Sequence, residues 1–189
     1  MEETVPGHRS TEQLSHGLDA IRSAPADAGV VRLIVRRPAV DEREVVQEAV
    51  LDVDEGLVGD TWRARGSGST ADGAADPQAQ VTVVNARAAE TIAGEIDLWP
   101  LAGDQLYVDL DISEQNLPPG TRLSMGEAEL EMSAKPHTGC AKYSARFGAD
   151  ALRFVASPEG RALRLRGANA RVVRGGVVRV GDSVLKLLD

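Results

Sequence analysis

A single cysteine, Cys140, lies in a segment that is rich in cationic side chains. Residues 135–142 read KPHTGCAK, and Arg146 follows one turn later. Cations that converge on a thiol lower its pKa, and the thiolate is the form that attacks electrophiles and binds soft metals. Free cysteines are also common as small buried hydrophobic residues. The segment alone therefore leaves two interpretations, an inert core residue or a reactive thiolate.

Three kinds of chemistry are compatible with a thiolate at this position. A zinc site is the weakest, because His137 and Cys140 offer two ligands and the chain has no second cysteine. A nucleophile with His137 as its base is a second interpretation. We expect Cys140 at the end of a strand, where residues three positions apart face opposite sides. The third is a thiolate that ligates a soft metal or carries a sulfur atom, beside an anionic cofactor held by arginines.

Charge is distributed unevenly along the chain. The net charge of −8 argues against general nucleic-acid binding. Residues 135–179 nevertheless hold ten Lys and Arg against only Asp150 and Glu159, whereas the rest of the chain has a net charge of −16. This contrast indicates a local site for a small anion. The alternative is a set of solvated arginines on strand faces.

Length and composition are those of a single globular domain. The chain has 189 residues, of which 42% are hydrophobic, and this is enough to form a substantial core. No apolar run is long enough to cross a membrane, and the N-terminus lacks the pattern of a signal peptide. One cysteine cannot form an internal disulfide, so we expect a cytoplasmic protein with neither membrane nor nucleic-acid partners.

The elements that must position Cys140 are mostly short strands. Residues 10–24 are predicted to form an amphipathic helix with Leu14, Leu18 and Ile21 on one face, so residues 1–28 are interpreted as an N-terminal helical extension and residues 29–189 as the main domain. The pattern predicts helices at 86–94 and 148–156. Strands are expected at 30–37, 45–53, 80–85, 106–112, 121–123, 128–133, 163–166, 170–174, 177–180 and 183–188. This predominance of strands predicts a mainly β fold, a barrel with a few peripheral helices.

Two further features concern the surroundings of the site. Residues 61–79 form a long loop with Trp62, Arg63 and Arg65, which suits either a ligand-contacting lid or a flexible surface.

The aspartates at 104, 109 and 111 lack the spacing of a calcium loop. We therefore expect them to face solvent.

Several motifs, taken in order, resemble those of the MOSC domain, which is named after the C-terminal domain of molybdenum cofactor sulfurase. The resemblance covers roughly residues 29–188. It is carried by His137-Thr138-Gly139-Cys140, Arg146-Phe147-Gly148, Arg166-Gly167-x-Asn169-x-Arg171 and Gly176-x-Val178-x-Val180-Gly181-Asp182, and more loosely by Gly56-Leu57-x-Gly59-Asp60, Gln80-Val81-Thr82-Val83-Val84 and Met125-Gly126.

The resemblance implies a β-barrel that holds a molybdenum cofactor (molybdopterin), with Cys140 as the ligand of the metal. It also implies that Arg166, Asn169 and Arg171 lie near the cofactor. From charge and proximity we add four residues to the expected site: Lys135, His137, Thr138 and Arg146. Thr61-Trp62 and Gln80 depart from the pattern of many standalone relatives, which have a basic residue at each place.

The activity implied by the resemblance is that of an oxidoreductase. Family members of this kind reduce N-hydroxylated compounds, so a small-molecule substrate is expected. A chain of this size would need separate electron-donor proteins. Two alternatives on the same fold remain: a sulfur carrier that uses Cys140 as a persulfide, and a protein that binds an anionic metabolite through its arginines.

Overall fold

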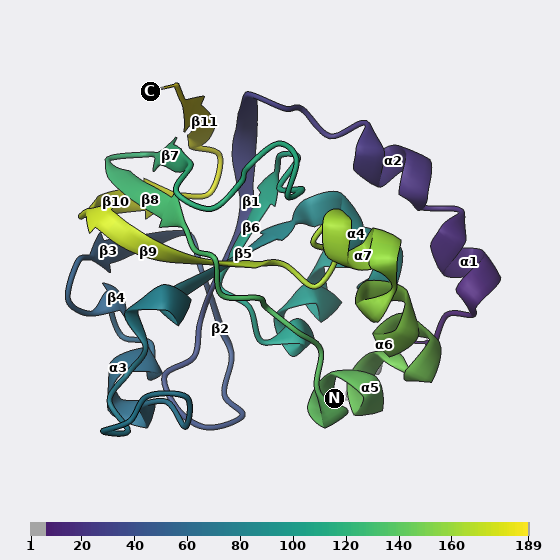
Figure 1. The fold of residues 1–189 in the computed structure, drawn as a ribbon, viewed down its shortest axis with the longest axis horizontal. Coiled ribbons are helices and arrows are strands. Elements are labelled where there is room, and N and C mark those ends of the chain that lie inside the picture. The colour runs from purple at the N-terminus through teal and green to yellow at the C-terminus, as the bar shows by residue number, and fades with distance from the viewer. Residues whose placement is uncertain (1–6, 189) are drawn as a thin grey trace.

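A computed structural model describes residues 7–188, which form a β-barrel with most of the helices gathered on one side (Figure 1). The barrel strands are β1 (Ala28–Arg36), β5 (Val81–Asn85), β6 (Leu106–Asp109), β7 (Arg122–Met125), β8 (Ala128–Met132), β9 (Ala168–Arg174) and β11 (Ser183–Leu187). They pair in the order β1-β6-β5-β9-β8-β7-β11, and β11 closes the barrel on β1. The predicted β-barrel is thus confirmed, although helices take up about as many residues as strands.

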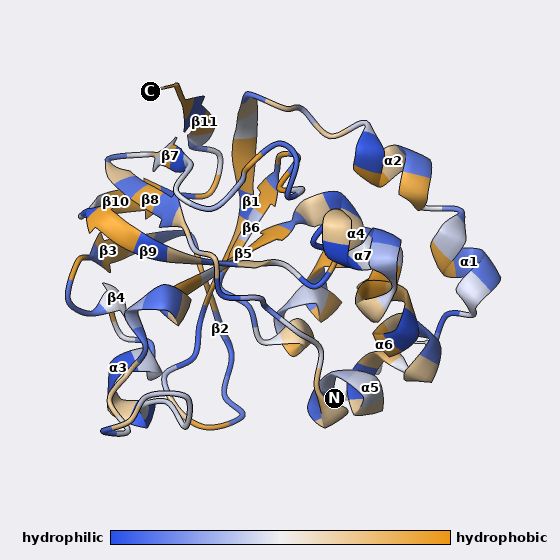
Figure 2. Cartoon of the chain, viewed as in Figure 1, coloured by the Kyte–Doolittle hydropathy of each residue, from blue (hydrophilic) through white to orange (hydrophobic). Residues whose placement is uncertain are grey.

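Alternation of apolar and polar residues builds the barrel core. In β8, Ala128, Leu130 and Met132 are buried, whereas the intervening Glu129 and Glu131 are partly exposed. Hydrophobic residues accordingly concentrate on the barrel strands (Figure 2). All neighbouring pairs are antiparallel except β5 and β6. Parallel strands need a crossover, and α4 (Ala86–Ala93) with the 3-10 helix η2 (Ile96–Ala102) supplies it.

A small second sheet lies beside the barrel. It consists of β10 (Gly176–Arg179), β3 (Glu48–Asp52) and β4 (Gly56–Leu57). By contrast, β2 (Glu44–Val46) pairs antiparallel with the end of β1. The single strand predicted at 45–53 is therefore divided between two sheets. The long loop that follows contains α3 (Trp62–Arg65) and the 3-10 helix η1 (Pro77–Ala79).

A second apolar core lies between the barrel and its helices. It joins α4, α5 (Ala141–Phe147) and α6 (Ala149–Ala156), and α7 (Pro158–Ala162) follows directly. Helix α5 was not predicted from the sequence. In it, Tyr143 and Phe147 are both buried, with ring centroids 5.0 Å apart, because residues four apart share a helix face.

The prediction of a strand at 163–166 is wrong. Arg164 has a φ of 50°, which does not fit a strand, and the segment forms successive turns. Leu165 is buried in the second core, so the apolar positions here fill a gap between helices rather than one face of a sheet.

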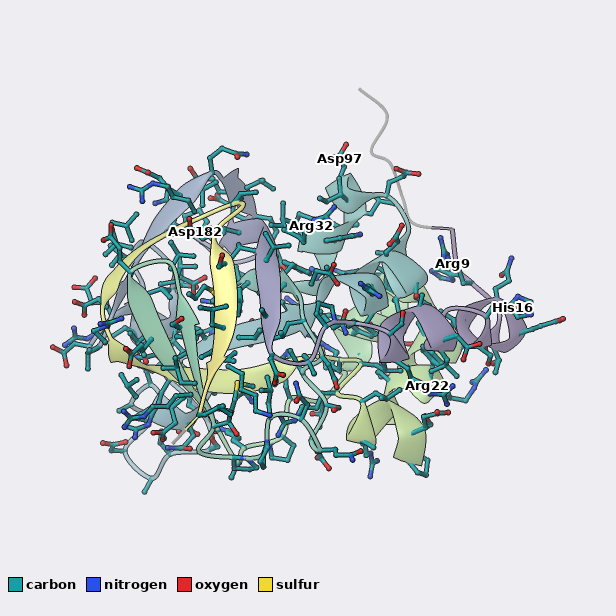
Figure 3. All side chains as sticks on the ribbon, turned by 90° about the horizontal axis from the view of Figure 1, so that it is seen from above. Arg9, His16, Arg22, Arg32, Asp97 and Asp182 are labelled. Carbon is teal, nitrogen blue, oxygen red and sulfur yellow. The ribbon has the colours of Figure 1, made fainter. Side chains whose placement is uncertain are left out.

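The N-terminal segment forms two short helices instead of one. Helices α1 (Thr11–Ser15) and α2 (Leu18–Arg22) meet near His16, which is exposed at the end of the molecule opposite Asp182 (Figure 3). Leu14 and Ile21 are buried in the second core, as their spacing predicts. No described helix is long and apolar enough to cross a membrane.

Candidate functional site

The segment between β8 and α5 contributes to two pockets. Cys140 is exposed in extended backbone directly before α5, and β8 ends eight residues earlier, so the expected position at the end of a strand is wrong. The Cys140 pocket has a volume of about 250 Å³ and is lined by Cys140, Arg37, Arg43, Arg65, Lys142, Arg146, Asp41 and neighbouring residues. The Asn169 pocket, of about 700 Å³, is lined by residues 133–139 and by Val155, Ala156, Arg161, Arg164, Arg166 and Asn169, among others.

Positive charge dominates the Cys140 pocket. Its cations come from the end of β1, from the loop after it, from α3 and from α5: they are Arg37, Arg43, Arg65, Lys142 and Arg146. Among residues 7–188, the only carboxylate in the lining is Asp41, which lies 3.0 Å from Lys142 Nζ and 3.3 Å from Arg146 Nη2. The pocket therefore favours an anionic ligand.

A buried ion pair fixes Arg37 at this pocket. Both carboxylate oxygens of Asp60 accept hydrogen bonds from the Arg37 guanidinium, at 2.7 and 2.8 Å, and Oδ1 also accepts one from the backbone of Trp62. The Asp60 side chain is fully buried. A Cβ at Gly59, whose φ is +84°, would lie 2.8 Å from the Arg36 side chain. The Gly59-Asp60 motif thus shapes the turn that holds Arg37.

At Arg43 and Arg65, the effects of burial and of neighbouring cations outweigh the attraction of the nearby carboxylates. Burial lowers the pKa of both guanidinium groups, and nearby cations lower it further: Arg146 and Arg37 for Arg43, and Arg37 for Arg65. Arg43 Nε is buried and has no hydrogen-bond partner among residues 7–188. A bound anion would relieve both the charge repulsion and this unmade hydrogen bond.

A buried network lies between the two pockets. Asp104 is 1% exposed; one of its oxygens pairs with Arg166 and the other lies 2.7 Å from His137 Nε2. The expectation that Asp104 faces solvent is therefore wrong. The Arg166 guanidinium also lies 4.7 Å from the centroid of the Tyr143 ring. Because His137 precedes Cys140 by three residues and Tyr143 follows it by three, the network anchors the chain on both sides of the thiol.

Opposing effects set the ionisation of this network. Burial would raise the pKa of the Asp104 carboxyl, but the charges and hydrogen bonds of Arg166 and His137 lower it to about 2. Burial and the charge of Arg166 lower the pKa of His137 in spite of Asp104. His137 is therefore neutral near pH 7. An ionised carboxylate only accepts, so His137 Nε2 donates to Asp104 and Nδ1 keeps its lone pair.

These shifts predict how stability depends on pH. Because the folded-state pKa of His137 lies below its ordinary value of about 6.5, the unfolded chain binds the proton more readily. Acidification through that value should lower the free energy of unfolding. The contribution of Asp104 should persist until the pH falls through about 4 towards 2.

Urea unfolding between pH 7.5 and 5 measures the contribution of His137. The variant His137→Gln, which keeps an amide donor but does not titrate, should show a flatter profile than the parent protein. The same change at the exposed His16 serves as the control. Equal slopes in the parent and His137→Gln would contradict the assignment.

The residues expected from the sequence separate into three groups. Cys140 and Arg146 line the Cys140 pocket, whereas five others line the Asn169 pocket: Lys135, His137, Thr138, Arg166 and Asn169. Arg171 lines neither pocket, because its guanidinium lies on the exposed face of β9 and pairs with Glu131. The arginines at 174 and 179 likewise pair with glutamates on strand faces.

The loop 61–79 contacts both sides of the Cys140 segment. Arg65 lines the Cys140 pocket, and Trp62 is buried. Asp76 Oδ2 lies 2.5 Å from Lys135 Nζ and compensates its charge. The loop thus contributes one cation to the Cys140 pocket and a counter-charge to Lys135.

Five residues of the site were not expected from the sequence: Arg37, Arg43, Asp60, Asp104 and Tyr143. The Gly59-Asp60 motif and the paired arginines at the end of β1 carried a signal for the Arg37–Asp60 pair. Asp104 had no such signal, because its partners lie 33 and 62 residues away.

Comparison with known families identifies the class of protein. The family model of the MOSC domain matches residues 70–185, more than half of the chain, so the protein belongs to the MOSC domain family. A search of curated proteins gave no match.

Solved structures share this fold at low sequence identity. YuaD from Bacillus subtilis is 16% identical, with a TM-score of 0.64 over 83% of this chain and 94% of that one. YiiM from Escherichia coli is 18% identical, with a TM-score of 0.55 over 85% and 70% of the two chains. YiiM from Geobacillus stearothermophilus is 13% identical, with a TM-score of 0.53 over 86% and 74%.

Proposed function

We propose that the protein binds the molybdenum cofactor in the Cys140 pocket and reduces N-hydroxylated compounds. The observation that carries the proposal is an exposed thiol at a pocket with five cations, in a chain of the MOSC family. Thiolates suit soft metals, and arginines suit the phosphate and oxygen atoms of a pterin cofactor.

The residues present fit such a cofactor. Arg43 offers a buried donor without a partner, and Arg65 offers a cation crowded by Arg37. Within residues 7–188, no three His, Cys, Asp or Glu side chains converge as metal ligands. A metal at Cys140 would therefore take its other ligands from a cofactor rather than from this part of the chain.

Each part of the pocket has a distinct role in the proposal. Cys140 provides the protein ligand, while Arg37, held by Asp60, and the neighbouring cations bind the anionic parts of the cofactor. The Asp104 network acts as a positioning device for the Cys140 segment. Exposure of Cys140 lets a substrate approach from solvent.

The proposed reaction converts an N–OH group to N–H and consumes two electrons and two protons, with release of water. When bound, the cofactor would supply two-electron chemistry at a metal that accepts an oxygen atom. The electrons come from a separate donor protein. The chain's own residues bind and orient; none is assigned the proton transfer.

Chemical analysis of the protein purified from molybdate-supplied cells tests this proposal. We expect molybdenum and pterin in equal amounts, and loss of both on Cys140→Ser. Cyanide-releasable sulfur on Cys140 without molybdenum would instead show a sulfur carrier. Absence of molybdenum, pterin and labile sulfur would leave the binding of an anionic metabolite and overturn the enzyme hypothesis.

A further inference from the structure

The Asn169 pocket is a second cavity with the size of a small-molecule site. Its volume of about 700 Å³ lies within the usual range for such sites. Neither Cys140 nor a cation of the Cys140 pocket lines it. Five of its lining residues are apolar: Pro119, Pro136, Val155, Ala156 and Ala168. These residues can contact the hydrocarbon part of a ligand.

Two hydrogen-bond acceptors on this cavity have no partner among the described residues. Asn169 is 4% exposed, and its side-chain nitrogen donates to the carbonyl oxygens of Lys135 and Pro136, at 3.1 and 3.2 Å. These bonds fix the amide orientation and leave Oδ1 free. His137 donates through Nε2 to Asp104, which leaves Nδ1 as an acceptor. An N–H or O–H group of a ligand would satisfy either one of them.

Two arginines, Arg161 and Arg164, also line the Asn169 pocket. Arg161, on α7, is exposed and forms no ion pair within residues 7–188. Arg164 is half-buried and uses Nη1 to donate to the carbonyl oxygens of Leu117 and Ile112, so its remaining donors stay available. Glu114 is the only carboxylate that the described part of the chain places in the lining. Two arginines beside one glutamate suit a ligand with a single negative charge.

We propose that the Asn169 pocket binds a small organic anion separate from any cofactor at Cys140. Its anionic group pairs with Arg161 and Arg164, its apolar body packs against Val155 and Ala156, and an N–H or O–H group donates to one of the two acceptors, His137 Nδ1 or Asn169 Oδ1. This site does not depend on the proposed function, since none of its contacts involves Cys140.

The dye 8-anilinonaphthalene-1-sulfonate is a suitable probe, because it combines a sulfonate, an apolar ring system and an N–H group. Fluorescence titration of the full chain should show saturable binding. Ala156 is exposed, so Ala156→Trp should fill the pocket without disturbing the core and should weaken binding at least about tenfold. Arg161→Gln should weaken it about fivefold. The neutral analogue N-phenyl-1-naphthylamine should respond to Ala156→Trp but not to Arg161→Gln.

Matched controls separate this pocket from other positive surfaces. Arg171→Gln removes an exposed strand-face cation, and Arg146→Gln and Cys140→Ser alter the other pocket. All three should bind the dye like the parent protein. Absence of saturable binding, unchanged binding by Ala156→Trp with native circular dichroism, or loss of binding on Arg146→Gln would overturn the proposal. Loss of molybdenum from Cys140→Ser with unchanged dye binding would support both proposals independently.

Discussion

Replacing Asp104 with alanine is expected to lower the free energy of unfolding by about 3–5 kcal/mol. Asp104 is 1% exposed and pairs with Arg166, which is 9% exposed. Removal of the carboxylate leaves the buried guanidinium with one carbonyl partner, Ala102, and the face of the Tyr143 ring. An uncompensated buried charge costs far more than a lost surface contact. Urea unfolding at pH 7 measures the difference.

Two further variants test the physical reason for this effect. Asp104→Asn keeps the shape and removes the charge, so it should retain only part of the stability. Glu48→Ala breaks an exposed pair with Arg179 and should cost less than about 1 kcal/mol. A loss for Asp104→Ala as small as that for Glu48→Ala would show that the network does not stabilise the fold.

Replacing Cys140 with serine is expected to have the largest effect on activity. Groups that only support a metal ligand typically change affinity or activity by about 10–100-fold, so loss of the ligand itself should reduce activity at least about 100-fold. The assay is reduction of an N-hydroxylated amidine with a chemical electron donor, which makes the result independent of the natural donor protein. Cys140 is exposed, so the substitution should leave the unfolding free energy of the cofactor-free protein nearly unchanged.

The control for this assay is Arg171→Gln. The sequence places Arg171 in the motif expected near the cofactor, but the structure pairs it with Glu131 outside both pockets. The variant should therefore keep its activity. Arg43→Glu, by contrast, reverses a charge within the Cys140 pocket and should lower activity and cofactor retention together. Full activity in Cys140→Ser with native cofactor content would refute the assignment of the ligand.

The barrel could be predicted from the sequence because its determinants are local. Alternation in Ala128 to Met132 marks one buried face, and Gly126 marks the turn before it. The interpretation of Cys140 as a reactive thiolate also rests on a local feature, the cationic residues beside it in the sequence. The structure changes what those neighbours do: Lys135 pairs with Asp76 and His137 with Asp104.

Three of the five cations in the Cys140 pocket could not be placed there from the sequence, because they come from distant parts of the chain. Arg37 and Arg65 reach the pocket from the end of β1 and from α3, and only the closed barrel brings these ends together. Asp104 reads as one acid among several in a polar stretch, and nothing local shows that it is buried. The alternation at Leu163 to Arg166 was misleading because Arg164 turns the chain.

X-ray absorption at the molybdenum edge, with selenocysteine in place of Cys140, tests the central claim most directly. Cys140 is the only cysteine, so the substitution places selenium at one defined position. A selenium atom bonded to molybdenum is the result that the proposed function predicts. A cofactor-loaded protein whose molybdenum has no selenium neighbour would contradict the claim that Cys140 ligates the metal.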